Sequence, residues 1–393
     1  MIVGIDASNI RAGGGVTHLV ELLGAADPVA SNITKVVVWG SRSTLCKIAD
    51  REWLQKVEDP ALERGILRRT FWQRFELSDS ADAHNCDVLF VPGGNDVSKF
   101  ASTVVMSQNM LPFEWHELFR FGISALTFRF VLLRFSQGRS FRNASGVIFL
   151  TTYARDGVVR VIGKMLGTDT VISHGLNSRF FLKPRRQRLF SEFTAESPCR
   201  LVYVSIVHLY KHHWHVIEAV SRLRNEGIHV TLELVGPPAS GTSRLKHALK
   251  TYDSGHEFVN YRGEVPYEEL HKIYGSADVG IFASTCENLP NILLEKMAAG
   301  LPVACSNFGP MPEVLGSSGV YFSPEQPGEI ADALRQLIFS ADMRKRLAQD
   351  SYQKAQKYTW EECARQTFDF LARVSCVGKL ANTSQSCDGI EIV

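Results

Sequence analysis

The feature that most constrains the fold is a repeated alternation of short, β-branched apolar runs with longer segments of helical pattern. Such runs predict strands, and helices between consecutive strands favour parallel pairing, because a parallel neighbour requires a long crossover. The sequence therefore predicts an α/β fold made of two successive doubly wound units. The expected strands of the first unit are Ile2–Asp6, Lys35–Trp39, Asp87–Val91, Thr103–Ser107 and Gly146–Leu150. Those of the second are Arg200–Val204, His229–Val235, Glu257–Asn260, Val279–Ala283, Val303–Cys305 and Val320–Phe322.

The length of 393 residues agrees with two domains, since single hydrophobic cores rarely grow this large. We expect one Rossmann-like domain over residues 1–175 and a second over 176–355. A helix is expected over residues 356–377, followed by a loose polar tail over 378–393. Ligands of doubly wound domains bind at the carboxyl ends of the strands, so we expect the two domains to face a cleft.

Composition narrows the class of protein. The hydrophobic fraction is 45%, the charged fraction is 21%, and the net charge of +2 does not indicate nucleic-acid binding. Eight cysteines without metal-ligand spacing indicate reduced core thiols. The first residues enter a strand, and no apolar run reaches the roughly 18 residues of a spanning helix. We therefore expect a cytoplasmic protein without a signal peptide.

The stretch 284–303 contains the strongest functional signal. Glu287 and Glu295 are separated by seven residues, with an apolar strand before them and a helical segment from Ile292 to Ala299. Glu287 is expected in the loop and Glu295 about one turn inside the helix. A helix N-terminus suits a phosphate, and carboxylates suit the hydroxyls of a sugar and a ribose. The pattern predicts a nucleotide-sugar site, with a ligand-free strand-loop-helix as the alternative.

This stretch resembles the glutamate-x7-glutamate signature of retaining glycosyltransferases of the glycosyl transferases group 1 type, which have the GT-B fold. The likeness continues through Gly300-Leu-Pro302 and Ser306-Asn-Phe-Gly309-Pro-Met-Pro-Glu313. It implies that Glu287 touches the donor sugar and that Glu295 binds the ribose. It also implies that the terminal helix returns to the first domain. Further donor-binding residues are expected at Asn288, Leu289, Pro290 and Asn291.

A second resemblance within the same family begins after the strand at Arg200–Val204. The family's Gly-Arg-Leu-x-x-x-Lys segment is matched by Lys211 at the lysine, whereas Ser205 replaces the glycine and Ile206 replaces the arginine. Ser205 is expected to bind the donor, and Lys211 to act with Glu287 in catalysis by neutralising the leaving diphosphate. The missing arginine leaves this charge to Lys211, backbone amides, and either Lys296 or a histidine.

No metal or cofactor is expected. The chain contains no Asp-x-Asp motif, and histidines 208, 212, 213 and 215 match no zinc spacing. A retaining transfer passes through an oxocarbenium-like state. The resemblance implies front-face transfer in which the leaving diphosphate assists, so that no strong base is needed.

Residues of the first domain are expected on the phosphate and acceptor side of the cleft. The glycine-rich segment Arg11–His18 follows the first strand, and glycines allow backbone to approach a ligand closely. The resemblance places Gly14 and Gly15 near the donor phosphates and His18 near the acceptor. Gln108 and Asn109 would offer neutral hydrogen bonds to acceptor hydroxyls. A purely structural glycine turn, and a loop that only turns the chain at residues 107–114, remain alternatives.

Residues 118–142 are rich in arginine and phenylalanine, and no acidic residue occurs from Leu118 to Arg155. Such a segment is typical of a helix on an anionic membrane surface. A core helix with arginine caps explains the same pattern. The membrane interpretation predicts a lipid-linked acceptor and a peripheral protein on the inner face of the cytoplasmic membrane.

Taken with the resemblance, the sequence predicts a retaining hexosyltransferase with a UDP-, GDP- or ADP-linked donor and a glycan or lipid-linked glycan acceptor. The form of the signature resembles bacterial enzymes of surface-polysaccharide and O-antigen assembly. A sugar-nucleotide epimerase or a phosphorylase of the same fold remains an alternative. A non-catalytic nucleotide-sugar-binding protein is a third.

Overall fold

The computed structural model describes residues 1–387, with side chains up to residue 376. The chain divides into two compact units. Unit 1 consists of Met1–Phe113, Phe128–Gly175 and the chain from Thr359 onward. Unit 2 consists of Glu114–Thr127 and Leu176–Tyr358.

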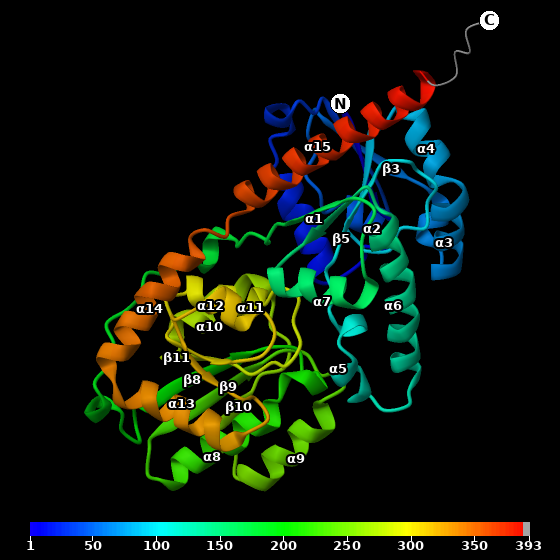
Figure 1. The fold of residues 1–393 in the computed structure, drawn as a ribbon. Coiled ribbons are helices and arrows are strands. Elements are labelled where there is room, and N and C mark those ends of the chain that lie inside the picture. The colour runs from blue at the N-terminus through cyan, green and yellow to red at the C-terminus, as the bar shows by residue number, and fades with distance from the viewer. Residues whose placement is uncertain (388–393) are drawn as a thin grey trace, which may run out of the picture. The chain divides into compact units, whose positions relative to one another are not determined.

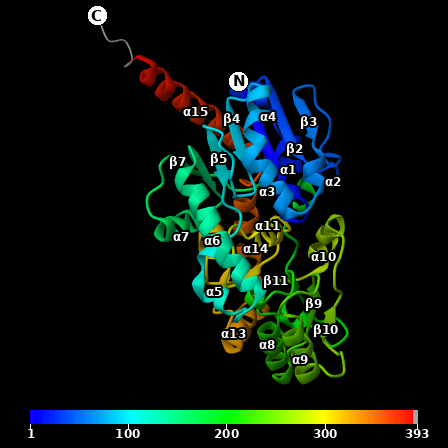
Figure 2. The same cartoon turned by 90° about the vertical axis from the view of Figure 1, so that its right-hand side faces the viewer.

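Unit 1 contains a seven-stranded parallel sheet in the order β3-β2-β1-β4-β5-β6-β7. Figure 2 shows β2 and β3 side by side at one edge of this sheet. The strands are β1 (Ile2–Ala7), β2 (Lys35–Gly40), β3 (Leu54–Glu58), β4 (Val88–Val91), β5 (Thr103–Met106), β6 (Gly146–Phe149) and β7 (Thr168–Val171). The helices are α1 (Gly14–Gly24), α2 (Arg42–Leu45), α3 (Ile66–Phe75), α4 (Leu77–Ala83), α6 (Ala125–Asn143), α7 (Thr152–Ile162) and α15 (Trp360–Cys387).

Unit 2 contains a six-stranded parallel sheet in the order β10-β9-β8-β11-β12-β13. The strands are β8 (Cys199–Val204), β9 (Val230–Val235), β10 (Val259–Tyr261), β11 (Val279–Phe282), β12 (Val303–Ser306) and β13 (Val320–Phe322). The helices are α5 (Trp115–Phe119), α8 (His213–Asn225), α9 (Thr242–Tyr252), α10 (Leu270–Ser276), α11 (Asn291–Ala298), α12 (Met311–Leu315), α13 (Pro327–Phe339) and α14 (Ala341–Ala355). Helices α8 and α9 lie side by side (Figure 1).

Both strand orders are doubly wound, which confirms the predicted α/β fold class. Each predicted strand has a counterpart in the structure, because a central parallel strand is buried on both faces and reads as a continuous apolar run. Two strands, β3 and β7, were not predicted. They lie at the edges of the first sheet, and their half-exposed sequences LQKVE and TDTV are too polar to stand out.

The terminal helix returns to unit 1 as expected, whereas the tail and the segment Glu114–Thr127 differ from expectation. Helix α15 packs against α1 and β4 within unit 1 and runs alongside α1 in Figure 1. Its backbone stays helical to Cys387, so the prediction of a loose tail from residue 378 is wrong as far as that residue. Residues 388–393 of the expected tail lie outside the described residues. The segment Glu114–Thr127 groups with unit 2, although the sequence placed it in the first domain.

Candidate functional site

The centre of the sheet in unit 2 is a topological switch point. Strands β8 and β11 pair directly, and the chain builds outward from them in opposite directions. The loop with Ser205 and Lys211 follows β8, and the loop with Glu287 follows β11. Because the carboxyl ends of parallel strands meet at one edge, these loops converge where doubly wound domains bind ligands.

Lys211 and Glu287 form an ion pair at this edge. The Lys211 ammonium donates to Glu287 Oε1, and the two side chains are only 8% and 15% exposed. The ammonium also lies 5.1 Å from the ring centroid of Phe282 and 5.4 Å from that of Tyr210. Tyr203 Oη donates to the Lys211 carbonyl at 2.7 Å, which fixes the turn. The structure thus brings together the two residues expected to act in catalysis, and their roles stay predictions.

Thr285 joins three segments beside this pair. Its backbone N–H donates to the Tyr210 carbonyl at 2.9 Å, and its hydroxyl donates to Glu117 Oε2 at 2.7 Å. Glu117 is buried on α5 and also accepts a hydrogen bond from Arg120 Nε at 2.8 Å, while Arg120 Nη2 bonds Glu325 at 2.7 Å. Sequence reasoning missed this network, because no local pattern relates α5 to a loop so distant along the chain.

Glu295 and Lys296 are a buried pair of opposite charge in α11. Glu295 is 3% exposed and accepts a hydrogen bond from Tyr274 Oη at 2.8 Å. Burial raises the pKa of Glu295 to about 7, although the bond from Tyr274 and the charge of Lys296 oppose this shift. Burial lowers the pKa of Lys296 to about 7. The Lys296 ammonium lies 5.3–5.9 Å from the ring centroids of Tyr203, Tyr274 and Phe282. The predicted contact of Glu295 with a ribose stays a prediction.

The remaining donor residues of unit 2 cluster around the start of α11. Asn288, Leu289 and Pro290 are buried, Pro290 is the N-cap residue, and Asn291 is the first residue of the helix. Ser205 is buried directly after β8, and its hydroxyl bonds the Ile206 carbonyl at 3.2 Å. Ile206, at the place of the expected arginine, is exposed.

The histidines after β8 have different contacts. His213 stacks on Tyr203 with ring centroids 4.6 Å apart, and His212 Nε2 lies 3.3 Å from Thr285 Oγ1. Burial lowers the pKa of His212 to about 2 and that of His213 to about 3. Among the described residues, no group of three or more His, Cys, Asp or Glu side chains is placed to hold a metal ion.

The glycine-rich segment in unit 1 leaves space at the start of α1. Gly13 has φ 67°, and a Cβ on Gly13 or Gly14 would meet no atom within 4 Å. A Cβ on Gly15 would lie 3.8 Å from Gln108 Oε1, so Gln108 lies beside this segment. Asn109 Oδ1 accepts the Leu111 N–H at 3.1 Å, as in the alternative in which this loop simply turns the chain.

His18 lies inside unit 1 and away from its surface. Its ring packs against that of His174 with centroids 4.5 Å apart and planes tilted by 31°, and its centroid lies 5.9 Å from that of Trp360. Neither ring nitrogen has a hydrogen-bond partner among the described residues, and burial holds its pKa well below the ordinary value. The acceptor-side roles of His18, Gln108 and Asn109 stay predictions.

Residues 118–142 present apolar side chains to solvent. Phe128, Leu132 and Phe135 are spaced along one exposed face of α6, and Phe119 and Ile123 before the helix are also exposed. This exposure contradicts the alternative of a core helix with arginine caps at these positions. No helix in the described part of the chain is both long and apolar enough to cross a membrane.

Comparisons with known proteins agree with this geometry. Residues 198–340 match the family described as glycosyl transferases group 1. O-antigen chain mannosyltransferase B of Escherichia coli is 30% identical over 112 residues, which are 28% of this chain and 29% of that protein. The matched segments span between 24% and 32% of the lengths of three curated relatives.

Two solved structures show the fold. Sucrose-phosphate synthase from Thermosynechococcus elongatus is similar with a TM-score of 0.72 at 16% identity, covering 96% of this chain and 99% of that chain. HepE of Anabaena, in complex with UDP-glucose, is similar with a TM-score of 0.69 at 16% identity, covering 95% and 99%. The chain therefore has the GT-B fold, and its residues 198–340 match the glycosyl transferases group 1 family.

Proposed function

We propose that this protein is a retaining, metal-independent glycosyltransferase that moves a hexose from a nucleotide-sugar donor to a glycan or lipid-linked glycan. The observation that carries the proposal is the Lys211–Glu287 pair at the switch point of the sheet in unit 2. A doubly wound sheet binds its ligand there, and the pair combines a cation for a diphosphate with a carboxylate for sugar hydroxyls.

Donor binding would exchange the partners of Lys211. Without donor, its ammonium is neutralised by Glu287 in a largely buried site. A diphosphate with two negative charges would compete for the same ammonium and release the Glu287 carboxylate to accept hydrogen bonds from the sugar. In front-face transfer, the leaving phosphate oxygen then takes the proton of the acceptor hydroxyl as the new glycosidic bond forms on the same face of the sugar.

Charge neutralisation would rest on few cations. Ile206 cannot supply the charge of the arginine that the family carries, and Lys296 is fully buried, so it acts on the diphosphate through space rather than by contact. This arrangement makes Lys211 the main cation within reach of the leaving group in unit 2.

The donor class and the pathway are proposed by analogy. HepE is solved with UDP-glucose, and the E. coli relative is an O-antigen mannosyltransferase. By analogy with these proteins, we propose that the donor is a UDP-, GDP- or ADP-linked hexose. We also propose that the protein acts in bacterial surface-polysaccharide or O-antigen assembly.

Calorimetric titration with UDP, GDP and ADP, in buffer with a metal chelator, tests the donor site. We expect one nucleotide to bind, and Lys211→Met to weaken it about tenfold or more, because a charge-assisted contact to phosphate is lost. Lys272→Met, which removes an exposed lysine of α10, is the matched control and should bind as the wild type does. Failure of all three nucleotides to bind would overturn the proposal.

The stereochemistry is tested separately by NMR of the product. Retention of the donor's anomeric configuration is expected. The opposite configuration would exclude front-face transfer while leaving the donor site in place.

A further inference from the structure

The outer face of α3 in unit 1 is apolar and exposed. Leu67 is 85% exposed and Ile66 is 63% exposed, and Phe71 and Phe75 continue the row one and two turns further along the helix. The Phe71 and Phe75 rings contact each other with centroids 4.6 Å apart. Scattered apolar residues are normal on a surface, but four in a row on one helix mark an interaction site.

The inner face of α3 is fixed to the unit. Trp72 is buried and donates through Nε1 to Asp59 Oδ2 at 2.9 Å. Gln73 is buried and accepts a hydrogen bond from Asn9 Nδ2 at 3.0 Å, while its amide donates to Asp6. The helix is therefore held in position from below, and its apolar row is not a consequence of loose packing.

Cations line this row. Arg68 lies over the Phe71 ring at 5.4 Å, Arg74 over the Phe75 ring at 6.0 Å, and Lys99 also over Phe75 at 6.0 Å. None of the ion pairs within the described residues involves Arg64, Arg68 or Arg74. Helix α3 contains no acidic residue, so the surface is basic as well as apolar.

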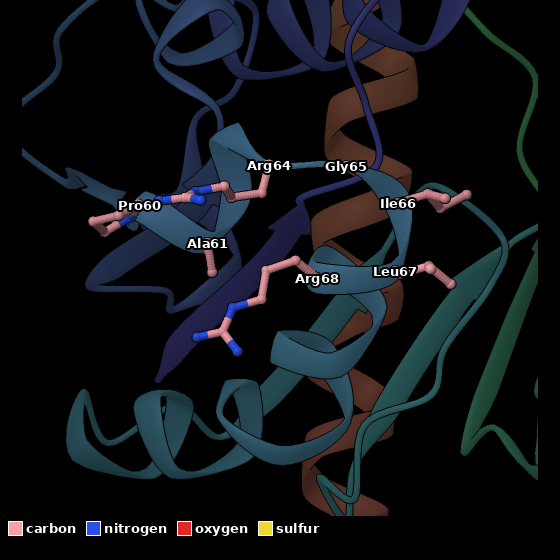
Figure 3. Close-up of a pocket in the computed structure, with 7 residues that line it drawn as sticks. All are labelled: Pro60, Ala61, Arg64, Gly65, Ile66, Leu67 and Arg68. Atoms are coloured by element: carbon pink, nitrogen blue, oxygen red, sulfur yellow. The ribbon is translucent and has the colours of Figure 1, made fainter.

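An open hollow of about 760 Å³ lies at the N-terminal end of α3. It is lined by Pro60, Ala61 and the run Arg64–Arg68. In Figure 3, the Arg64 side chain extends toward Pro60 and the Arg68 side chain extends to the same side, whereas Ile66 and Leu67 extend to the opposite side. Two guanidinium groups beside a hollow suit a phosphate-bearing headgroup, and the apolar pair beside them suits acyl chains.

We propose that residues 60–75 form a docking surface for an anionic lipid bilayer. Charge complementarity selects this occupant, because unpaired arginines flank the apolar row on a helix without acids. Ile66, Leu67, Phe71 and Phe75 enter the acyl boundary, and the arginines contact lipid phosphates. Nucleic acid would pair with the arginines but would not cover the apolar row.

The docking surface adjoins the glycine-rich segment. Arg69 Nη1 donates to the Ser8 carbonyl at 3.0 Å, and Arg11 donates to the Leu62 carbonyl. The two contacts tie α3 and the segment just before it to the loop that precedes Gly14. A lipid-linked acceptor embedded in the bilayer would therefore have its sugar held near this loop, an inference that rests on the proposed function.

The docking surface is distinct from the exposed face of α6, and the loop at residues 96–99 lies between the two. Lys99 lies over Phe75, and Asp96 of the same loop bonds Ser140 of α6, backbone N to Oγ, at 3.0 Å. The two helices thus flank residues 96–99, and a bilayer could contact both.

Vesicle flotation of the full chain, without acceptor lipid, tests the proposal. We compare vesicles of phosphatidylcholine alone with vesicles containing phosphatidylglycerol, at low and high salt. We expect binding to the anionic vesicles, weakened by salt. Leu67→Asp with Phe71→Asp should reduce it at least about tenfold, and Arg64→Glu with Arg68→Glu should do so as well. The matched controls are Leu166→Asp and Arg160→Glu, which change an exposed leucine and an exposed arginine elsewhere in unit 1.

Two outcomes would overturn the proposal. Flotation that is equal for neutral and anionic vesicles, or absent from both, excludes an anionic bilayer as the occupant. Loss of flotation with Phe128→Asp and Phe135→Asp in α6, but not with the α3 substitutions, assigns the surface to α6 instead. Nucleotide titration of the same variants should match the wild type, so failure of the docking surface is distinguishable from failure of the donor site.

Discussion

At the residue scale, His213 shows how burial determines a charge. Its ring is buried against Tyr203, and burial lowers its pKa to about 3 from an ordinary value near 6.5. The folded protein therefore resists protonation at a pH at which the unfolded chain accepts a proton. The contribution of His213 to stability is fully present above pH 6.5 and is lost as the pH falls toward 3.

We predict that replacing His213 with Phe reduces the acid sensitivity of the protein. Between pH 6.5 and 4, each such histidine lowers the free energy of unfolding by about 1.4 kcal/mol for every unit by which the pH falls. Phe keeps an aromatic ring against Tyr203 but cannot bind a proton. Urea unfolding at several pH values should show a shallower slope for the variant. His229→Asn, which changes an exposed histidine, should keep the wild-type slope. An unchanged slope in His213→Phe would contradict the assignment.

At the scale of elements, α5 is a five-residue helix that stabilises a loop of the candidate site. Its Glu117 carboxylate accepts hydrogen bonds from Thr285 and Arg120, and Arg120 continues the network to Glu325. The Thr285 loop carries Glu287 two residues later. The position of the Glu287 carboxylate therefore depends on a helix that the chain order assigns to the other half of the molecule.

We predict that Glu117→Ala lowers the free energy of unfolding by about 3 kcal/mol, because it leaves the Thr285 hydroxyl and the Arg120 guanidinium without their buried partner. Urea unfolding measures this loss. Faster cleavage by trypsin at Arg120 should accompany it. Glu268→Ala removes an exposed glutamate of unit 2 and serves as the control. A loss no larger than that of the control would show that the network contributes little.

At the scale of the whole molecule, the chain passes between the two units at residues 113–114, 127–128, 175–176 and 358–359. Within unit 1, a Cβ on Gly175 would lie 2.2 Å from the backbone nitrogen of Trp360. Within unit 2, the Leu176 N–H donates to the Tyr358 carbonyl at 2.9 Å. At the last two of these connections, each unit packs its own residues closely, and the close approach at Trp360 requires glycine.

We predict that Gly175→Ala displaces the start of α15 at a cost of about 1–3 kcal/mol, because the added methyl meets backbone atoms that cannot rotate away. Hydrogen exchange at residues 360–376 should become faster, and the urea midpoint should fall. Gly24→Ala, at the end of α1, adds a methyl where no atom lies within 4 Å and should be tolerated. Equal behaviour of the two variants would contradict the prediction.

The central strands, and the start of helix α11 at Asn291, could be predicted from sequence because the signals that mark them lie in neighbouring residues of the chain. A parallel strand buried on both faces is a continuous apolar run, and a helix start is marked by Pro and Asn beside it. The same locality explains what was missed, since the edge strands β3 and β7 carry polar residues on half-exposed faces.

The sequence by itself determined the central strands of both sheets and placed Lys211 and Glu287 after two of them. Their meeting follows from the rule that carboxyl ends of parallel strands share an edge. Only the tertiary structure decided that Tyr274 bonds Glu295, that Glu117 bonds Thr285 168 positions away, and that the α3 row stays exposed. The physical reason is that contacts between distant segments, and the burial that shifts a pKa, depend on packing that no local pattern specifies.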